Sequence, residues 1–542
     1  MKKIIYTIGA PGIAAVFLIL LVVACKKDED NEFALSRQFS PSTIATVNGE
    51  TKVGLGWTPS LFTQPGEVEY VVEISKNVDF SAIAFTTTTS ELILEITDET
   101  LAIKQDYFVR IKAIGKDGAG DSNWKTGGPF RITGEQFLQA VPNEDVSDVG
   151  VILRWRDNPT LTKIVLTPEG GSATEITLNE TDHAALQKTV MSLTQAKSYT
   201  AEIFQDAKTK GIITFKTKAS ITGNIVDLTG TTGNPGALVT ALGAAPSGSV
   251  IVLRRGEPYN ISAAFSFTKS VTIRTALGFG NNLATLRMTS NFTVTAGSTI
   301  DSLVFRDLII KGTRVNRTSF DSDYILNVGN ACVVKNVKLE SCIIKILRGV
   351  VRGQAAGAGA KFGNYTVNNC VIDSIKEFAI AAASNTSAFA NIKLTNSTLY
   401  KVRKFISLAT AGTPASVNNS MIIENCTINE SPGGAVLATT NFLLDYNTVV
   451  CTDGIAIKNS IIGSVWNETG TLASGMRAVS GTGVTITNSY STSDFTSTSP
   501  VPGLSTYSGT STALFTDPAN GNFKIKDATF AGKNTAGDPR WR

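Results

Sequence analysis

The chain has 542 residues, a formal net charge of +4 and a single histidine, His183. This length is enough for two to four domains, each with its own hydrophobic core. The small net charge, without a Lys/Arg run or a recognition-helix pattern, argues against a nucleic-acid-binding protein. One histidine also excludes His-metal clusters and Ser-His-Asp triads at any site that lacks it.

The first 25 residues have the pattern of an export signal. Lys2 and Lys3 precede an apolar run that ends at Cys25 and is too short to span a bilayer comfortably. The stretch "VVAC" (22–25) resembles a bacterial lipobox, and the acidic linker 26–35, which opens with "KKDEDNE", resembles the export signal of Bacteroidetes-type surface lipoproteins. The resemblance implies a chain acylated at Cys25, anchored in the outer membrane by its lipid alone and facing the cell exterior. The alternative is an ordinary signal peptide with an incidental cysteine.

The composition, with scarce helical patterns and frequent Val/Ile alternation, predicts an all-β protein. Residues 36–134 alternate apolar and polar residues in short segments, and Leu101 precedes Tyr107 by six residues. This spacing resembles the tyrosine corner of fibronectin type III domains. Leu193 and Tyr199 repeat it within 137–218. We therefore expect two such β-sandwiches in tandem, which act as spacers or bind sugar through an exposed aromatic ring.

From about residue 219 one short pattern recurs, with apolar residues at its second and fourth positions. The starts of successive copies are separated by 32, 34, 28, 27, 29, 34 and 29 residues, a loose period typical of a solenoid. One strand per coil in parallel register predicts a parallel β-helix of at least eight coils over 219–500. The copies are "SVTIRTA" (270–276), "SLVFRDL" (302–308), "NVKLESC" (336–342), "NYTVNNC" (364–370), "NIKLTNS" (391–397), "SMIIENC" (420–426), "GIAIKNS" (454–460) and "GVTITNS" (483–489).

Asparagine followed by Cys or Ser closes most of these copies. We expect the Asn at a bend between two sheets, because Asn tolerates left-handed backbone geometry and its amide can bond to the Asn of the next coil. The following position needs a small buried side chain, so its cysteines are predicted to be stacked free thiols rather than disulfides. The asparagines are Asn369, Asn396, Asn425, Asn459 and Asn488, and the small residues are Cys342, Cys370, Ser397, Cys426, Ser460 and Ser489.

This region resembles the pectate-lyase-like right-handed parallel β-helix family. The resemblance includes the entry segment "SGSVIVLRRGEPYNIS" (247–262) and the tail "LFTDPANGNFKIKD" with "AGDPRW" (514–527 and 536–541), so residues 501–542 are expected to form a C-terminal cap. The family's catalytic patterns are missing. The region has no histidine for a Gly-His-Gly motif, and no acidic column crosses the coils.

A basic column does cross them. Six residues beyond the Cys/Ser position the chain has Arg314, Arg348, Lys376 and Arg403, and two positions further it has Phe378 and Phe405. Stacked like charges repel unless an anion is close, and a line of cations matches the carboxylates of an extended uronate polymer. The phenylalanines would offer apolar faces to sugar rings if they point outward. The alternative is a set of solvated turn residues with phenylalanines in the core.

Three functions remain open. The first is a monomeric, lipid-anchored surface protein that binds an anionic, pectin-like polysaccharide and needs neither metal nor cofactor. The second is a polysaccharide lyase with Lys376 as its base, since neighbouring cations lower the pKa of a lysine, and with calcium held by loop residues such as Asp321 and Asp323. The third is an adhesin or structural stalk.

Overall fold

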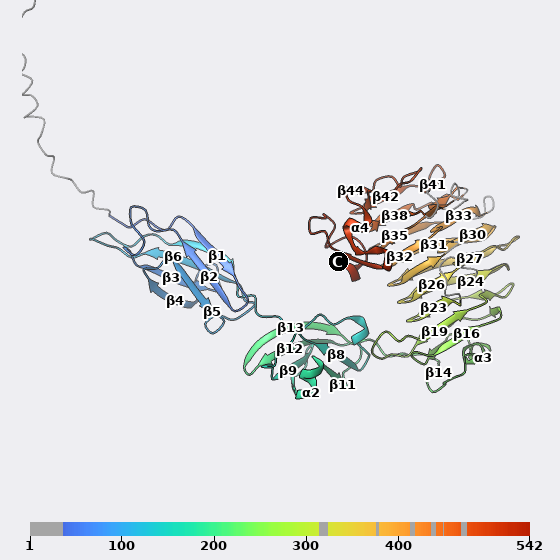
Figure 1. The fold of residues 1–542 in the computed structure, drawn as a ribbon, viewed down its shortest axis with the longest axis horizontal. Helices are drawn as coiled ribbons and strands as arrows, with labels where there is room; N and C mark the ends of the chain where they lie inside the picture. The colour runs from blue at the N-terminus through green and yellow to red at the C-terminus, as the bar shows by residue number, and fades with distance from the viewer. Residues whose placement is uncertain are drawn as a thin grey trace, which may run out of the picture. The chain divides into compact units, whose positions relative to one another are not determined.

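The structure is a computed structural model that describes residues 36–313, 324–375, 379–411, 418–434, 441–447, 449–467 and 474–542. The chain divides into two compact units, Met1–Val141 with Ile152–Val190 and Lys197–Lys216, and Pro142–Val151 with Met191–Ala196 and Thr217–Arg542. The described residues form antiparallel sandwich sheets followed by a parallel β-solenoid, as predicted (Figure 1). Among these residues, no helix has both the length and the apolar character needed to cross a bilayer.

The first sandwich has one sheet of three strands and one of four. Leu101 and Tyr107 are buried, and the backbone N–H of Ala102 donates a 3.1 Å hydrogen bond to the Tyr107 hydroxyl. The predicted tyrosine corner is therefore present. The three-stranded sheet is β1 (Ile44–Asn48), β2 (Lys52–Trp57) and β5 (Ile93–Thr97), and the other is β4 (Ile83–Thr89), β3 (Tyr70–Ser75), β6 (Tyr107–Ala113) and β7 (Lys125–Phe130).

The second sandwich pairs a two-stranded with a four-stranded sheet. Trp155 fills its core, and Tyr199 stacks on Phe215 with ring centroids 5.5 Å apart. The two-stranded sheet is β8 (Gly150–Arg154) with β11 (Gln187–Met191), and the four-stranded sheet is β10 (Thr174–Thr177), β9 (Lys163–Pro168), β12 (Ser198–Gln205) and β13 (Lys208–Lys216). The same region contains the 3-10 helix η1 (Asn143–Asp145) and helix α2 (Glu180–Ala185).

The solenoid has three parallel sheets, here numbered in the order in which each coil meets them. Helix α3 (Ala237–Ala244) lies between the first two strands of sheet 1 in the sequence. The strands of sheet 1 are β14 (Ile225–Leu228), β15 (Ser249–Leu253), β18 (Val271–Thr275), β22 (Leu303–Arg306), β25 (Cys332–Glu340), β28 (Ala360–Asn368), β31 (Ala388–Thr395), β34 (Ser420–Glu424), β38 (Ile455–Lys458) and β42 (Val484–Thr487), with β21 (Thr299–Ile300) also paired to β25.

Sheets 2 and 3 complete each coil. Sheet 2 contains β16 (Pro258–Ile261), β19 (Thr285–Met288), β23 (Ile309–Gly312), β26 (Ile343–Leu347), β29 (Val371–Ile375), β32 (Thr398–Val402), β35 (Thr427–Asn429), β39 (Ile461–Ile462), β43 (Tyr490–Thr492) and β44 (Ser505–Tyr507). Sheet 3 contains β17 (Phe265–Phe267), β20 (Phe292–Val294), β24 (Tyr324–Val328), β27 (Gly349–Gly353), β30 (Ala381–Asn385), β33 (Ile406–Ala411), β37 (Phe442–Tyr446) and β41 (Ser474–Ala478). A short pair joins β36 (Gly433–Gly434) to β40 (Trp466–Asn467).

The register of sheet 1 confirms the repeat read from the sequence. Val337 pairs with Tyr365, and Tyr365 pairs with Ile392, so the second positions of successive copies stack. These side chains and those at the fourth positions belong to one continuous buried core, in which Val484 and Ile486 of the last copy are partly buried. The apolar positions therefore determine which side of each strand faces the interior.

The bend between sheets 1 and 2 has the predicted chemistry. Asn369, Asn396, Asn425, Asn459 and Asn488 all have positive φ, between 45° and 54°. The next residue is buried in every coil from Cys342 to Ser489. Its side chain accepts a hydrogen bond from the equivalent backbone N–H one coil earlier, for example 3.0 Å from Cys370 N to Ser397 Oγ. Cys342, Cys370 and Cys426 of this column are free, which confirms the prediction of unpaired thiols, and Cys332 and Cys451 are free as well.

The C-terminal segment differs from a simple end cap. Helix α4 (Ser511–Leu514) and strands β45 (Phe515–Asp517) and β46 (Asn522–Ile525) form a small core with Tyr400 and Ile461 of sheet 2. The 3-10 helix η3 (Pro518–Asn520) lies between β45 and β46, and η4 (Pro539–Trp541) follows β46. The tail, red in Figure 1, thus packs along the outer face of β32 and β39 instead of only closing the last coil.

Candidate functional site

The predicted basic column can be followed in part. Leu347 pairs with Ile375 and Ile375 with Val402, so Arg348 and Arg403, which follow Leu347 and Val402, lie at equivalent positions two coils apart. The sequence alignment of Arg348 with Arg403 is therefore confirmed by the backbone register. Arg314, Lys376 and Phe378 lie outside the described residues, as do Asp321 and Asp323 and the predicted acylation site Cys25.

Phe405, the described phenylalanine of this column, lies in the core, as the alternative to sugar binding predicted. Phe405 is 0% exposed and belongs to the solenoid core, so its ring offers no face to a sugar. Arg403 is half-buried, and its guanidinium lies 5.3 Å from the centroid of the Trp466 ring. Trp466 is only 7% exposed. The described part of the column is thus a half-buried corner of the solenoid with little open aromatic surface.

A second line of cations lies on the outer face of sheet 2 and escaped the sequence analysis. Arg287 pairs with Lys311, and Lys311 pairs with Lys345, in three consecutive coils. Arg287 is exposed, and the two lysines are half-buried. None of the three makes an ion pair or side-chain hydrogen bond with any residue that the structure describes. We refer to Arg287, Lys311 and Lys345 as the cation stripe.

The stripe combines charge with apolar surface. Thr285, Ile309 and Ile343 stand two residues before the three cations and are paired in the same register. Residues two apart on a strand point to the same face, and equivalent residues of neighbouring coils are about 4.8 Å apart. The two half-buried isoleucines therefore flank the positive charges on one surface of the sheet. Such a surface suits an extended ligand that carries regularly spaced anions and apolar ring faces.

The stripe ends where the C-terminal segment begins to cover the sheet. Lys345 pairs with Asp373, and Asp373 pairs with Tyr400. Asp373 is buried and accepts a 2.6 Å hydrogen bond from Ser374 Oγ. Tyr400 is also buried and packs against Phe523, with ring centroids 5.4 Å apart. The tail thus stops short of the three coils that carry the stripe.

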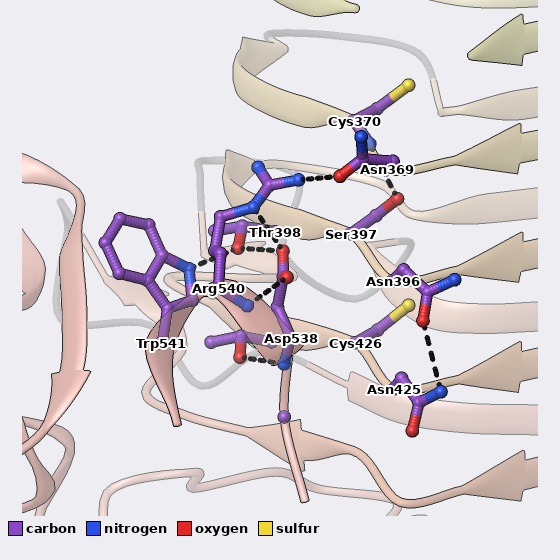
Figure 2. A network of polar contacts seen from close by, with 12 residues as sticks. Asn369, Cys370, Asn396, Ser397, Thr398, Asn425, Cys426, Asp538, Arg540 and Trp541 are labelled. Carbon is purple, nitrogen blue, oxygen red and sulfur yellow. Dashed lines mark hydrogen bonds and ion pairs between the residues drawn. The ribbon is translucent and has the colours of Figure 1, made fainter. Parts of the chain in front are cut away.

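The tail is held to the covered coils by polar contacts (Figure 2). Asp538 accepts a 2.7 Å hydrogen bond from Thr398 Oγ1, and Trp541 Nε1 donates to the same hydroxyl at 2.6 Å. Arg540 donates a 2.7 Å hydrogen bond to the side-chain oxygen of Asn369. Burial raises the pKa of the Asp538 carboxyl above its ordinary value, while the charge of Arg540 acts in the opposite direction. We call residues 538–542 the C-terminal strap.

The sequence does contain a signal for the stripe. The signal is missed when the same number of residues is counted from every repeat copy. Leu308 and Cys342 occupy the position directly after the bend, and Lys311 and Lys345 lie three residues further along the chain. In the preceding coil the equivalent residue is Ala284, because Ile309 N donates to Ala284 O just as Ile343 N donates to Leu308 O. Residues 276–283 form an insertion in that coil, so Arg287 cannot be aligned by counting from the end of the repeat copy.

Two parts of the chain match family models whose descriptions give no function. Residues 257–402 match the family described as Domain of unknown function (DUF4957), and residues 421–541 match Domain of unknown function (DUF5123). The first match contains the cation stripe, and the second contains most of the C-terminal strap. No curated protein matches the chain.

Among the solved structures that match the chain, two contain fibronectin type III domains. One is the crystal structure of chicken CNTN1 FN1-FN3 domains, with 13% identity and a TM-score of 0.16, covering 34% of this chain and 66% of that chain. This chain therefore spans just under two thirds of that structure. The other is a two fibronectin type-III domain segment from chicken tenascin, with 11% identity and a TM-score of 0.17, covering 33% of this chain and 99% of that chain.

Proposed function

We propose that the protein is a cell-surface lipoprotein whose solenoid binds an anionic, pectin-like polysaccharide along the cation stripe. The observation that carries the proposal is the register of Arg287, Lys311 and Lys345, three stacked cations without an anionic partner among the described residues. Like charges at paired positions destabilise a sheet, so the arrangement costs stability in the free protein, and a bound anionic ligand would offset this cost. The surface location rests on the lipobox-like stretch that ends at Cys25.

The spacing of the stripe suits a linear uronate polymer. Arg287 and Lys345 are two coils apart, which corresponds to about 10 Å along the solenoid axis. Successive sugars of an extended polyuronate present carboxylates at comparable intervals, so one chain can contact several cations at once. Exposed charge pairs contribute only about 0.2–1 kcal/mol each, and an array of them makes binding depend on polymer length.

Binding is proposed ahead of turnover because the described cations are arranged as a repeating surface rather than around one reacting centre. The lyase alternative needs Lys376, which lies outside the described residues, as its base. The two readings differ in one measurement. A lyase generates unsaturated uronates, which absorb at about 235 nm through the new double bond, whereas a binding protein leaves the polymer intact.

Affinity electrophoresis in polygalacturonate gels tests the site. Wild type is expected to be retarded, and the variant Arg287→Ala/Lys311→Ala/Lys345→Ala is expected to migrate as in a gel without polymer. Single variants should lose only a few-fold in affinity. A fully methyl-esterified pectin, which lacks the carboxylates, should not retard the wild type.

Two control variants identify the surface. Lys338→Ala/Lys393→Ala removes two cations from the outer face of sheet 1, where Lys338 and Lys393 are aligned through Thr366, and it should keep full retardation. Arg348→Ala/Arg403→Gln removes the described cations of the predicted corner column and should have little effect. If the corner variant loses retardation and the triple variant keeps it, the stripe is not the site. If wild type is not retarded, the proposed function fails.

A further inference from the structure

An exposed apolar cluster lies at one end of the first sandwich. The loop between β2 and β3 carries Leu61 and Phe62, which are 58% and 84% exposed. Phe39, which is 39% exposed, packs edge-on against Phe62 with ring centroids 5.7 Å apart. Large apolar side chains gathered on an open loop usually mark an interaction site. We call Phe39, Leu61 and Phe62 the apolar tip.

The loop is built to hold these side chains outward. Phe62 has a φ of 64°, in the left-handed region that a bulky aromatic residue rarely adopts. Ser60 is buried, and its backbone N–H donates a 2.9 Å hydrogen bond to the Tyr70 hydroxyl. The Thr63 hydroxyl donates at 2.7 Å to the carbonyl of Ser60. An unfavourable backbone that its neighbours fix in place is typical of functional positions.

The tip lies at the end of the sandwich where the N-terminal segment joins it. Tyr70 at the start of β3 pairs with Ala113 at the end of β6, so the loops 58–69 and 114–124 share one end. Arg37 forms a bridge with Gly120 in the second of these loops. The chain therefore enters the sandwich beside the tip. Only ten residues, 26–35, separate the predicted acylation site Cys25 from the first described residue.

We propose that the apolar tip docks on the lipid surface in which the chain's own anchor is inserted. This inference rests on the surface-lipoprotein part of the proposed function and is independent of polysaccharide binding. Ten residues span at most about 35 Å, which keeps the tip close to the bilayer. Docking would fix the orientation of the first sandwich on the membrane, because a lipid anchor alone leaves the domain free to tumble.

The chemistry of the tip favours lipid over sugar. Sugar recognition needs hydrogen-bonding groups beside an aromatic platform. At the tip, the Ser60 hydroxyl is used by the carbonyl of Phe39, and the Thr63 hydroxyl by the carbonyl of Ser60. The Phe39 and Phe62 rings are inclined at 65°, so they do not form a flat platform. Lipid accepts the same side chains without polar partners.

Vesicle flotation tests the inference with the chain from Lys26 to Arg542, which contains every described residue and lacks the predicted acylation site. This protein should float with neutral phosphatidylcholine vesicles. Leu61→Ser/Phe62→Ser should lower the bound fraction at least about ten-fold, since it removes most of the apolar surface that enters the lipid. Phe62→Leu, which keeps that surface, should retain most of the binding.

The matched control is Val78→Ser. Val78 is 72% exposed and follows β3, at the opposite end of the strand from Tyr70, so its loss should leave flotation unchanged. Phe62→Gly should lower flotation and raise the melting temperature, because glycine relieves the left-handed strain. Absence of flotation for wild type, equal flotation of wild type and the double serine variant, or binding that requires anionic lipid would overturn the inference. Retardation in polygalacturonate gels should be the same for all these variants, which separates this test from that of the stripe.

Discussion

The side-chain amide of Asn425 donates a 3.1 Å hydrogen bond to the side-chain oxygen of Asn396, one coil earlier in the solenoid (Figure 2). Asn488 and Asn459 make the same contact at 2.9 Å. Asn396, by contrast, donates to Asn368 at 3.0 Å, while the side-chain oxygen of Asn369 accepts from Arg540. The ladder is therefore interrupted where the C-terminal strap attaches to it.

The first prediction concerns this ladder. Asn425→Leu should lower the free energy of unfolding by about 1–3 kcal/mol, because leucine loses the amide hydrogen bonds and is unfavourable at the φ of 54°. Asn425→Gly tolerates that backbone angle and loses only the hydrogen bonds, so it should fall between wild type and the leucine variant. Urea unfolding of the three proteins measures the order. Equal stability of wild type and the leucine variant would contradict the role of the ladder.

The second prediction concerns the pH dependence of the strap. Burial raises the pKa of Asp538 in the folded chain above its ordinary value of 3.8. The folded state therefore keeps the proton to higher pH than the unfolded state does. The stability that the neutral carboxyl contributes is present below the unfolded pKa and is lost as the pH rises through the folded pKa.

The variant Asp538→Asn cannot ionise and should lack this loss. The free energy of unfolding of wild type relative to that of the variant should therefore decrease between about pH 4 and about pH 7. Urea unfolding of both proteins across this pH range measures the difference between their free energies of unfolding. The two proteins share all other titratable groups, so the contributions of those groups cancel in this difference. A difference that is independent of pH would show that Asp538 has the same pKa in both states.

The third prediction concerns the buried thiols. Burial raises the pKa of Cys426 to about 12 and that of both Cys332 and Cys451 to about 11. Since the thiolate is the reactive form, a thiol reagent near neutral pH should modify none of the five described cysteines in the folded chain and all five after unfolding. Cys426→Ser should keep the fold, because Ser397 and Ser460 occupy the equivalent positions of the neighbouring coils. Rapid labelling of the native protein would contradict this placement.

The fourth prediction links the cation stripe to stability. Lys311 lies between Arg287 and Lys345, so Lys311→Thr removes repulsion from both sides. The variant should be more stable by about 0.2–1 kcal/mol and should bind polygalacturonate more weakly. Urea unfolding at low and high salt checks the cause, since salt screens the repulsion and should shrink the difference. Lower stability of the variant would mean that Lys311 makes favourable contacts in the fold.

The fifth prediction concerns the anchor. Cys25→Ser should release the protein from the outer membrane, because the residue predicted to carry the acyl chains is lost. Protease treatment of intact cells should remove wild type from their surface. Wild type that is degraded only after cell lysis would contradict a surface location.

The sequence alone was sufficient to predict the two sandwiches, the parallel solenoid and the bends between its first two sheets. These features depend on local chemistry repeated along the chain. Alternating apolar residues select the inner face of each strand, and Asn with a small neighbour suits a left-handed bend in every coil. The same local requirement predicted the free state of Cys342, Cys370 and Cys426, which the structure confirms.

The tertiary structure decided which residues meet on the surface. The connection between sheets 1 and 2 differs in length from coil to coil. Arg287 aligns with Lys311 and Lys345 only because the extra residues of its coil form a loop there, and counting residues from the repeat cannot reveal this alignment. Phe405 lies in the core, and the C-terminal segment covers sheet 2 as far as Val371, because docking depends on faces formed by distant parts of the chain. The exposure of Phe62 likewise depends on how Ser60 and Tyr70 brace its loop. Periodicity describes one coil at a time, whereas these contacts are set by the packing of coils and loops against one another.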